Sequence, residues 1–275
     1  MADVKQVYQR PARQLDHLGE ELAFYIKALA WTPRTIRRYK KEILRILAEV
    51  TLGSGALAVI GGTVGVITAM CFFTGTEVGL QGYAALNQLG TAAFSGFVSA
   101  YFNTREIAPL VAAIALAATV GCGFTAQLGA MRISEEVDAL EVMAIPSMPF
   151  LVTTRIIGGL IAIVPLYVVG LLSSYFATRL TVTGFFGQST GTFDHYFNVF
   201  LPPGDVLWSF GKVLVFAVVV ILIHCYHGYT ATGGPAGVGV SVGRAVRTSI
   251  VAINVIDLFL SMAIWGTTTT VRLAG

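Results

Sequence analysis

The topology of this chain depends on one stretch, "GTEVGLQGYAALNQLGTAAFSGFVSAYFNTRE", which comprises residues 75–106. It lies between apolar runs, and polar side chains interrupt it at Glu77, Gln81, Asn87, Gln88, Ser95, Ser99 and Asn103. If the stretch crosses a membrane, the apolar run after it passes outward. If it forms short interfacial or re-entrant helices on the outer side, that run passes inward instead.

The apolar runs around this stretch reach about 20 residues, the length at which a helix spans a bilayer. The charge-free runs are residues 52–75, 107–131, 156–178 and 213–243, and a fifth run, 248–271, is broken only by Asp257. Only 12% of the 275 residues are charged, against about a quarter in soluble domains, and 55% are hydrophobic. The predicted fold is therefore an all-α polytopic membrane protein with five transmembrane helices, and a large soluble α/β enzyme is excluded.

Basic residues indicate the orientation, because short loops on the cytoplasmic side are enriched in Lys and Arg. When residues 75–106 do not cross the membrane, Arg132, Arg155, Arg244 and Arg247 all lie at cytoplasmic ends of spans. We therefore expect a cytoplasmic N-terminus, a periplasmic C-terminus and an external connection at residues 179–205 that contains a short helix. The Gly-rich segment "ATGGPAGVGVSVGR", residues 231–244, is predicted to be a flexible cytoplasmic loop before a last span that begins near Ala245.

The segment "RTIRRYKKEILRILAEV", residues 34–50, is typical of a basic amphipathic helix, and Pro33 suits its first turn. Its apolar residues recur at helical spacing: Ile36, Tyr39, Ile43, Leu44 and Leu47. Because it adjoins the first span, we expect it to lie on a membrane surface that carries anionic lipid. A solvated basic face is the alternative.

The sequence offers few sites for chemistry of its own. It lacks the GxxxxGK[ST] pattern of a phosphate-binding loop, so an ATPase would have to be a separate chain. Cys71, Cys122 and Cys225 are far apart, and His224 and His227 have no third ligand nearby, so neither a disulfide nor a metal site is expected. Gly61 and Gly65 form a GxxxG pair, a weak sign of close helix packing.

Four charges lie within or beside the predicted spans: Arg105, Glu106, Lys212 and Asp257. Such charges are costly in a membrane, and they pair with one another, line a cavity or mark a substrate path. We expect Asp257 to pair with Lys212, and Arg105, Glu106 and Lys212 to meet the acidic head of a lipid near the outer leaflet. Purely structural pairing is the alternative.

The densest acidic cluster lies in "MRISEEVDALEVMAIPSMP", residues 131–149, between two apolar runs. Ser134 is expected to cap a short helix there, and Pro146 and Pro149 to end it. Leu140 and Met143 are predicted to face the protein. The side chains predicted to face the cytoplasm are Glu135, Glu136, Asp138 and Glu141. A short capped helix between spans, about residues 133–146, could transmit force from a motor subunit; a solvated acidic face is the alternative.

At these residues the sequence resembles the MlaE/YrbE family of permease subunits of ABC lipid transporters, and most closely the B-type YrbE subunits that accompany actinobacterial Mce proteins. The matching segments are "GLQGY" (79–83), "NTREIAPLVAAIALAATVGCGFTAQLGAMRISEEVDALEVMAI" (103–145), "LVTTRIIGG" (151–159) and "GRAVRTSIVAINVIDLFL" (243–260). The resemblance implies a cytoplasmic N-terminal segment with an elbow helix over residues 1–50. It also implies a permease domain over 51–275 with five spans, a coupling helix and a periplasmic helical hairpin.

The resemblance also implies partners and a site. The partners would be a paralogous YrbE permease in a heterodimer, a cytoplasmic ATPase dimer that binds ATP and Mg, and Mce proteins in a periplasmic ring or tube. Arg105, Glu106, Lys212 and Asp257 match the family's polar pocket. The sequence departs from the family where many members have an arginine at Thr119 and a glutamate at Gln127, and "MAIPSMP" lacks the usual Asp-Pro.

The sequence therefore predicts a non-enzymatic permease of the bacterial inner membrane that imports fatty acids, phospholipids or sterols, with no cofactor in this chain and no nucleic-acid partner. A membrane-embedded lipid-modifying enzyme is an alternative, which would need His, Asp or Ser clustered at one membrane depth. A passive scaffold for an envelope complex is another.

Overall fold

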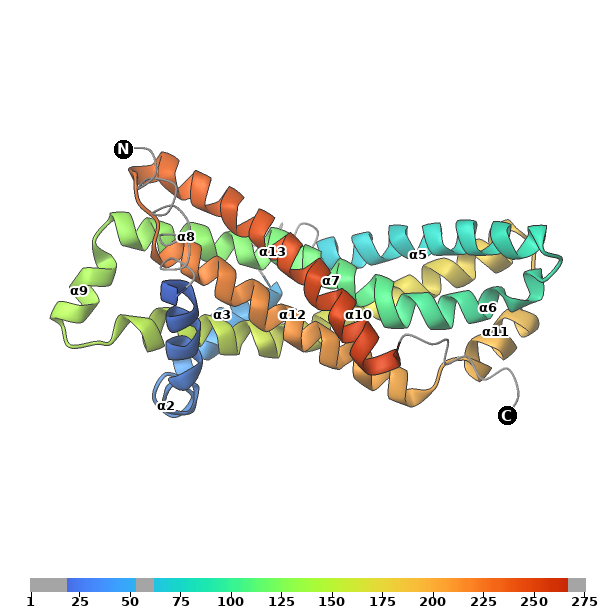
Figure 1. The fold of residues 1–275 in the computed structure, drawn as a ribbon, viewed down its shortest axis with the longest axis horizontal. Coiled ribbons are helices and arrows are strands. Elements are labelled where there is room, and N and C mark those ends of the chain that lie inside the picture. The colour runs from blue at the N-terminus through green and yellow to red at the C-terminus, as the bar shows by residue number, and fades with distance from the viewer. Residues whose placement is uncertain (1–18, 53–61, 267–275) are drawn as a thin grey trace, which may run out of the picture.

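The computed structural model describes residues 19–52 and 62–266, and the regular elements in these ranges are all helical (Figure 1). Residues 19–30 form a helix that precedes α2. The elements that follow are α2 (Thr32–Arg38), α3 (Lys40–Leu52), α5 (Thr63–Gln88), η1 (Ala92–Phe94), α6 (Ser95–Val98), η2 (Ser99–Ile107), α7 (Ala108–Leu116), η3 (Ala117–Gly121), α8 (Cys122–Ile133), α9 (Glu136–Val142), η4 (Met148–Thr153), α10 (Thr154–Arg179), η5 (Leu180–Phe185), α11 (Thr190–Val199), α12 (Pro203–Tyr229) and α13 (Gly234–Trp265).

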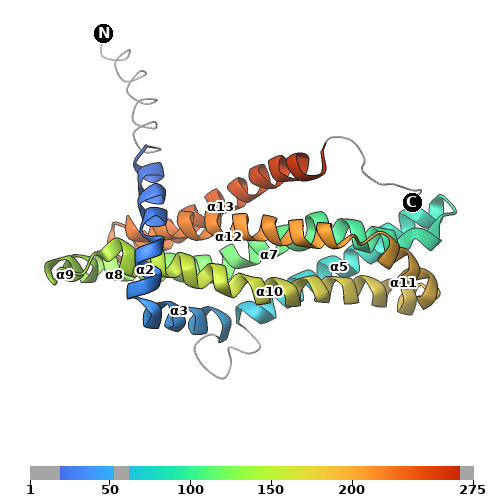
Figure 2. The same ribbon diagram turned by 90° about the horizontal axis from the view of Figure 1, so that it is seen from below.

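Several of these elements join end to end into five helices that are long and apolar enough to cross a membrane. They are Thr63–Gln88, Ala92–Ile133, Met148–Phe185, Pro203–Tyr229 and Gly234–Trp265. The all-α fold with five candidate spans is therefore confirmed, and the chain is a multi-pass membrane protein. The spans pack into an elongated bundle, with α9 at one end and α11 at the other (Figures 1 and 2).

Residues 75–106 form neither an extra crossing nor separate interfacial helices. Instead, α5 continues to Gln88, the chain reverses around Gly90 at a φ of 70°, and the second long helix begins at Ala92. Within this stretch, Asn103 donates a hydrogen bond to the Thr178 hydroxyl group of α10 at 2.9 Å. Among the described residues the first candidate span is therefore Thr63–Gln88, which extends past the predicted end at Gly75. Residues 53–61 of the predicted run, including Gly61 of the GxxxG pair, lie outside the described residues.

The predicted single helix over residues 34–50 is wrong, because the chain bends at Tyr39 between α2 and α3. The Tyr39 ring packs edge-on against Phe150 at 5.3 Å, which holds the bend against the start of the third span. Pro33 lies in the first turn of α2, as predicted. The buried face of α3 consists of Ile43, Ile46 and Val50, whereas Ile36 and Leu44, which were expected on the apolar face, are exposed.

The Gly-rich segment 231–244 is not a flexible loop, since α13 begins at Gly234 and is continuous to Trp265. Gly233 adopts a φ of 88° that turns the chain, and Pro235 lies in the first helical turn, where its missing N–H costs nothing. A Cβ atom at Gly129 of α8 would lie 2.8 Å from the Val238 side chain. Close packing against α8 therefore offsets the helix-breaking tendency of the glycines.

Candidate functional site

All four charged residues predicted from the spans meet in one cluster. Arg105 and Glu106 lie near the end of η2, Lys212 lies on α12 and Asp257 on α13. The η2 segment is π-helical, and such local widening of a helix is frequent at functional sites. Three helices that are distant in sequence therefore converge on this charge cluster.

Lys212 is the centre of the cluster, and its side chain is 0% exposed. Its ammonium group lies 2.7 Å from an Asp257 carboxylate oxygen, so the predicted pair is confirmed. It also donates hydrogen bonds to the Arg105 carbonyl oxygen at 2.7 Å and the Ser261 hydroxyl group at 2.8 Å. A Glu106 oxygen lies 3.2 Å away, and Glu106 accepts a further hydrogen bond from Ser261 at 2.8 Å. The buried cation is therefore surrounded by acceptors from η2 and α13.

Arg105 pairs with a residue that the sequence did not single out, Asp205 in the first turn of α12. Its guanidinium group contacts one Asp205 carboxylate oxygen, at 2.7 Å from Nε. The other Asp205 oxygen accepts a hydrogen bond from the Trp265 indole N–H at 2.9 Å. The guanidinium carbon also lies 4.1 Å from the centre of the Tyr101 ring. These contacts join η2, the start of α12 and the end of α13.

Asp205, Ser261 and Trp265 were missed because sequence does not show that the start of α12 and the end of α13 lie beside η2. The only signals were an acid after "PPG" and a tryptophan near the end of the last span. With these residues included, the cluster contains two cations, Arg105 and Lys212, and three carboxylates. Both cations already have carboxylate partners, so an acidic lipid head would have to displace one of them. Glu106 is the most accessible partner, with a side chain that is 37% exposed.

The acidic helix is α9, at the end of the bundle (Figure 1). Ser134 does not cap it. Its hydroxyl group bonds back to the Ala130 carbonyl oxygen at 3.0 Å and so closes the end of α8. The cap position of α9 is Glu135, whose φ of 61° lets the chain turn sharply between the two helices. The predicted cap is therefore wrong, while the helix that it was meant to start is present.

All four acidic side chains, Glu135, Glu136, Asp138 and Glu141, are exposed. Three of them bind back to the bundle, and the first is Glu136, which accepts a 3.0 Å hydrogen bond from Ser134 at the end of α8. Asp138 forms a 2.6 Å ion pair with Arg132 of α8. Glu141 accepts a 2.6 Å hydrogen bond from Ser147, whose hydroxyl oxygen lies 2.8 Å from the Tyr229 hydroxyl group at the end of α12. The helix is thus connected to both α8 and α12.

The apolar residues that pack α9 against the bundle are the expected ones, with the exception of Met143. Val137 is buried and Leu140 is partly buried against the core, as predicted for Leu140. Met143 was predicted to face the protein and is 62% exposed, beside Val142 at 88%. The helix ends at Val142, and the positive φ of Ala144 turns the chain away, so Met143 no longer lies on the inner face. Two apolar side chains and four acids therefore lie on the exposed side of α9.

Comparison with known proteins agrees with this architecture. The profile of the permease MlaE family matches residues 53–263. The chloroplast protein TRIGALACTOSYLDIACYLGLYCEROL 1 of Arabidopsis thaliana is 32% identical over 200 residues, 70% of this chain and 56% of the plant protein. A probable ABC transporter permease of Synechocystis is 33% identical over 172 residues, 62% of this chain and 65% of that protein.

The intermembrane phospholipid transport system permease protein MlaE of Haemophilus influenzae is 27% identical over 195 residues. That alignment covers 70% of this chain and 75% of the Haemophilus protein. By contrast, the chain spans little more than half the length of its Arabidopsis relative. The family match covers well over half of the chain and includes both the charge cluster and α9. The chain therefore belongs to the MlaE family of ABC transporter permeases.

Proposed function

We propose that this permease moves a lipid across the bacterial inner membrane, with the driving force entering through α9. The observation that carries the proposal is the connection from Glu141 through Ser147 to Tyr229. Tyr229 ends α12, and the same helix carries Lys212 of the charge cluster. A displacement of α9 would therefore be passed along a continuous helix to Lys212.

The orientation that fits this role has α9 and the N-terminal segment in the cytoplasm, and α11 and the end of α13 on the periplasmic side. Arg132 supports it, because it lies at the end of the span Ala92–Ile133 beside α9, and Arg155 lies about two helical turns inside the span that begins at Met148. A cytoplasmic ATPase dimer would then bind ATP and Mg and contact α9 as the coupling helix. The exposed apolar pair Val142 and Met143, which follows Glu141 at the end of α9, is suited to such a contact.

A second permease chain would complete the transporter, and we propose a paralogous YrbE subunit. The outer face of α13 supports a partner, since it exposes the large apolar side chains Val251, Val255, Leu258, Phe259 and Met262. The departures at Thr119 and Gln127 fit a heterodimer, in which each half can specialise. Mce proteins in a periplasmic ring or tube, and import as the direction, follow from the sequence resemblance to YrbE subunits.

The proposed substrate site is the cluster of Arg105, Glu106, Lys212 and Asp257. A fatty acid or phospholipid would place its acidic head against Arg105 and Lys212 and release a carboxylate that now holds them; a sterol would use the apolar walls alone. The Haemophilus relative, an intermembrane phospholipid transport permease, favours phospholipid among these classes. Structural pairing alone remains the competing explanation of the cluster.

Charge reversal on α9 tests the coupling role. Glu135→Lys combined with Glu136→Lys should lower the amount of ATPase that co-purifies with the permease, because both exposed acids become basic. Asp194→Lys is the control, since it reverses a surface acid of α11 at the opposite end of the bundle. Unchanged ATPase recovery in the α9 variant would contradict the proposal.

The substrate site is tested separately. Arg105→Gln and Lys212→Gln keep polar side chains but remove both charges, and lipid uptake should fall in variants that still fold. Thermal unfolding of each purified variant shows whether it folds. If lipid uptake is intact when Arg105→Gln and Lys212→Gln are combined, the cluster has only a structural role.

A further inference from the structure

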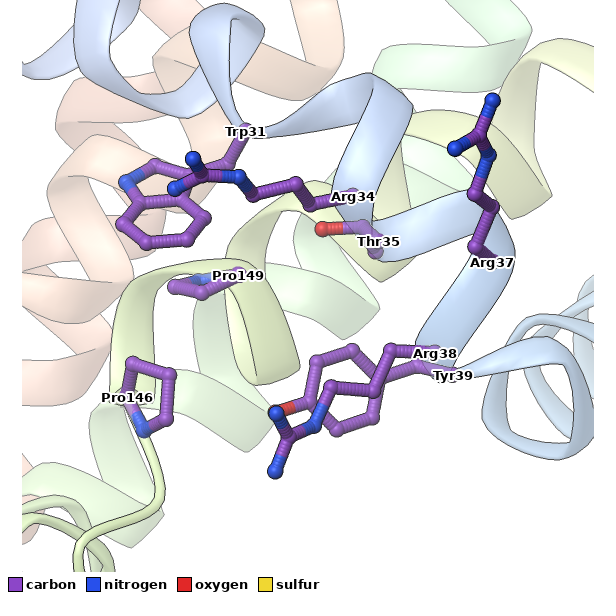
Figure 3. Close-up of a pocket in the computed structure, with 8 residues that line it drawn as sticks. All are labelled: Trp31, Arg34, Thr35, Arg37, Arg38, Tyr39, Pro146 and Pro149. Carbon is purple, nitrogen blue, oxygen red and sulfur yellow. The ribbon is translucent and has the colours of Figure 1, made fainter.

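A pocket of about 450 Å³ lies between the N-terminal helices and the segment that leads from α9 into α10 (Figure 3). Its walls come from Trp31 to Tyr39 on one side and from Pro146 and Pro149 on the other. Pro149 lies in η4, at the beginning of the span Met148–Phe185. The pocket therefore lies beside the beginning of that candidate span.

The lining of this pocket is strongly basic. Arg34, Arg37 and Arg38 are among its lining residues, and no carboxylate is among the described residues that line it. None of the three arginines forms an ion pair within residues 19–52 and 62–266. Instead, Arg34 lies over the Trp31 ring at 5.4 Å and Arg38 over the Tyr39 ring at 5.9 Å. The pocket thus concentrates positive charge that the described part of the chain does not neutralise.

A buried hydroxyl group points to the same conclusion independently. Thr35 is 0% exposed, yet its Oγ1 atom has no hydrogen-bond partner among the described residues. Figure 3 shows this oxygen on the side of the pocket that faces Arg34 and Pro149, while the guanidinium group of Arg37 points away from the other two. A buried polar atom without a partner costs free energy unless a ligand or water supplies one.

We propose that this pocket binds a phosphate group, carried by an anionic lipid headgroup or by free phosphate. Guanidinium groups match the geometry of phosphate oxygens, and the Thr35 hydroxyl group would donate a further hydrogen bond. Trp31 and Tyr39 favour the lipid as the source, because these residue types are enriched at the level of the headgroups. A bound phosphate would link α2 to the connection that follows α9. This inference goes beyond the transport role and does not depend on it.

The test uses the full chain, purified with the partners that accompany it, and measures binding by native mass spectrometry. The three probes are phosphatidylglycerol, diacylglycerol, which lacks phosphate, and inorganic phosphate. Phosphatidylglycerol should bind and diacylglycerol should not. Arg34→Ala combined with Arg38→Ala should weaken binding roughly tenfold or more, because two charge-assisted hydrogen-bond donors are lost. Binding of inorganic phosphate alone, with the same dependence on the arginines, would support the site and identify free phosphate as the source.

Two further variants distinguish binding in this pocket from a non-specific effect of positive charge on the protein surface. Thr35→Val keeps the side-chain shape, so it should leave the unfolding temperature unchanged or higher and weaken phosphate binding a few-fold. Lys41→Ala removes one exposed charge outside the pocket and should change nothing. Equal binding in wild type and pocket variants, or an equal loss in Lys41→Ala, would overturn the proposal. Loss of a co-purifying protein with phosphate binding intact would also overturn it and identify a protein-docking surface.

Discussion

The Lys212 ammonium group of α12 lies 2.7 Å from an Asp257 carboxylate oxygen of α13, and the lysine side chain is completely buried. The same ammonium group contacts Glu106 and the Arg105 carbonyl oxygen of η2. One cation therefore holds three helices together. Because buried charges are stable only when paired, the stability of the bundle should depend on this lysine more than on any exposed one.

Lys212→Met should lower the unfolding free energy by about 3–5 kcal/mol, since Glu106 and Asp257 would face each other without a cation. Thermal unfolding of the purified protein in detergent measures the effect. Lys212→Met combined with Asp257→Leu should recover part of the loss, because one uncompensated carboxylate is gone. Lys41→Met, at an exposed lysine of α3, is the control and should have little effect. If Lys212→Met is as stable as Lys41→Met, the Lys212–Asp257 pair contributes nothing measurable to stability.

Ser147→Ala should separate ATPase binding from transport. The Ser147 hydroxyl group bridges Glu141 of α9 and Tyr229 of α12, and alanine removes both contacts without altering the exposed acids. We expect unchanged co-purification of the ATPase and a reduced ratio of lipid transported to ATP hydrolysed in reconstituted vesicles. Ser134→Ala, at the opposite end of α9, is the matched control, because this hydroxyl group also binds an acid of the helix, Glu136, while its other hydrogen bonds go to α8 and not to α12. An unchanged ratio in Ser147→Ala would mean that force does not pass through this bridge.

The spans and the central ion pair could be predicted from sequence because membrane physics restricts the choices. Apolar runs of sufficient length must cross, and Lys212 needed an acidic partner, which Asp257 supplied. The third candidate span, Met148–Phe185, contains the predicted apolar run of residues 156–178 and extends beyond it at both ends. The predicted run of residues 213–243 is instead divided between Pro203–Tyr229 and the beginning of Gly234–Trp265. These elements follow from composition alone.

The helix ends could not be predicted, because they depend on tertiary partners. The sequence placed the first boundary at the polar residues after Gly75, but Gln81 bonds Glu77 one turn away at 2.9 Å and α5 continues. The glycines of residues 233–243 favoured a loop, whereas packing on α8 makes them helical. Asp205 could not be predicted as a member of the cluster, because it contacts Arg105 only when α12 and η2 lie side by side. The local sequence does not show contacts between residues that are far apart along the chain.

Gly75→Ala should destabilise the packing of α5 on α10. A Cβ atom at Gly75 would lie 2.5 Å from the Ser174 carbonyl oxygen, which belongs to the backbone and cannot rotate away. We expect the free energy of unfolding to fall by about 1–3 kcal/mol, the usual cost of overpacking. Thermal unfolding would show this as a lower unfolding temperature. Gly123→Ala in α8 is the control, since nothing lies within 4 Å of its Cβ position and alanine favours the helix. Equal stability of the two variants would contradict the close approach.

Acidification should loosen α11 from α10. Arg179 donates two 2.8 Å hydrogen bonds to Asp194, and these hold the pKa of the Asp194 carboxyl group below its ordinary value. Because the folded-state pKa is depressed, the stabilisation is present above the unfolded value of about 3.9 and is lost as pH falls through the folded-state pKa. Asp194→Asn should therefore lower the free energy of unfolding at pH 7 by at most about 1 kcal/mol, because the pair is so exposed, and the unfolding temperature should fall slightly. The difference between variant and wild type should shrink as the pH falls below 3.9. A difference that is constant with pH would mean that the carboxylate charge is not what joins the two helices.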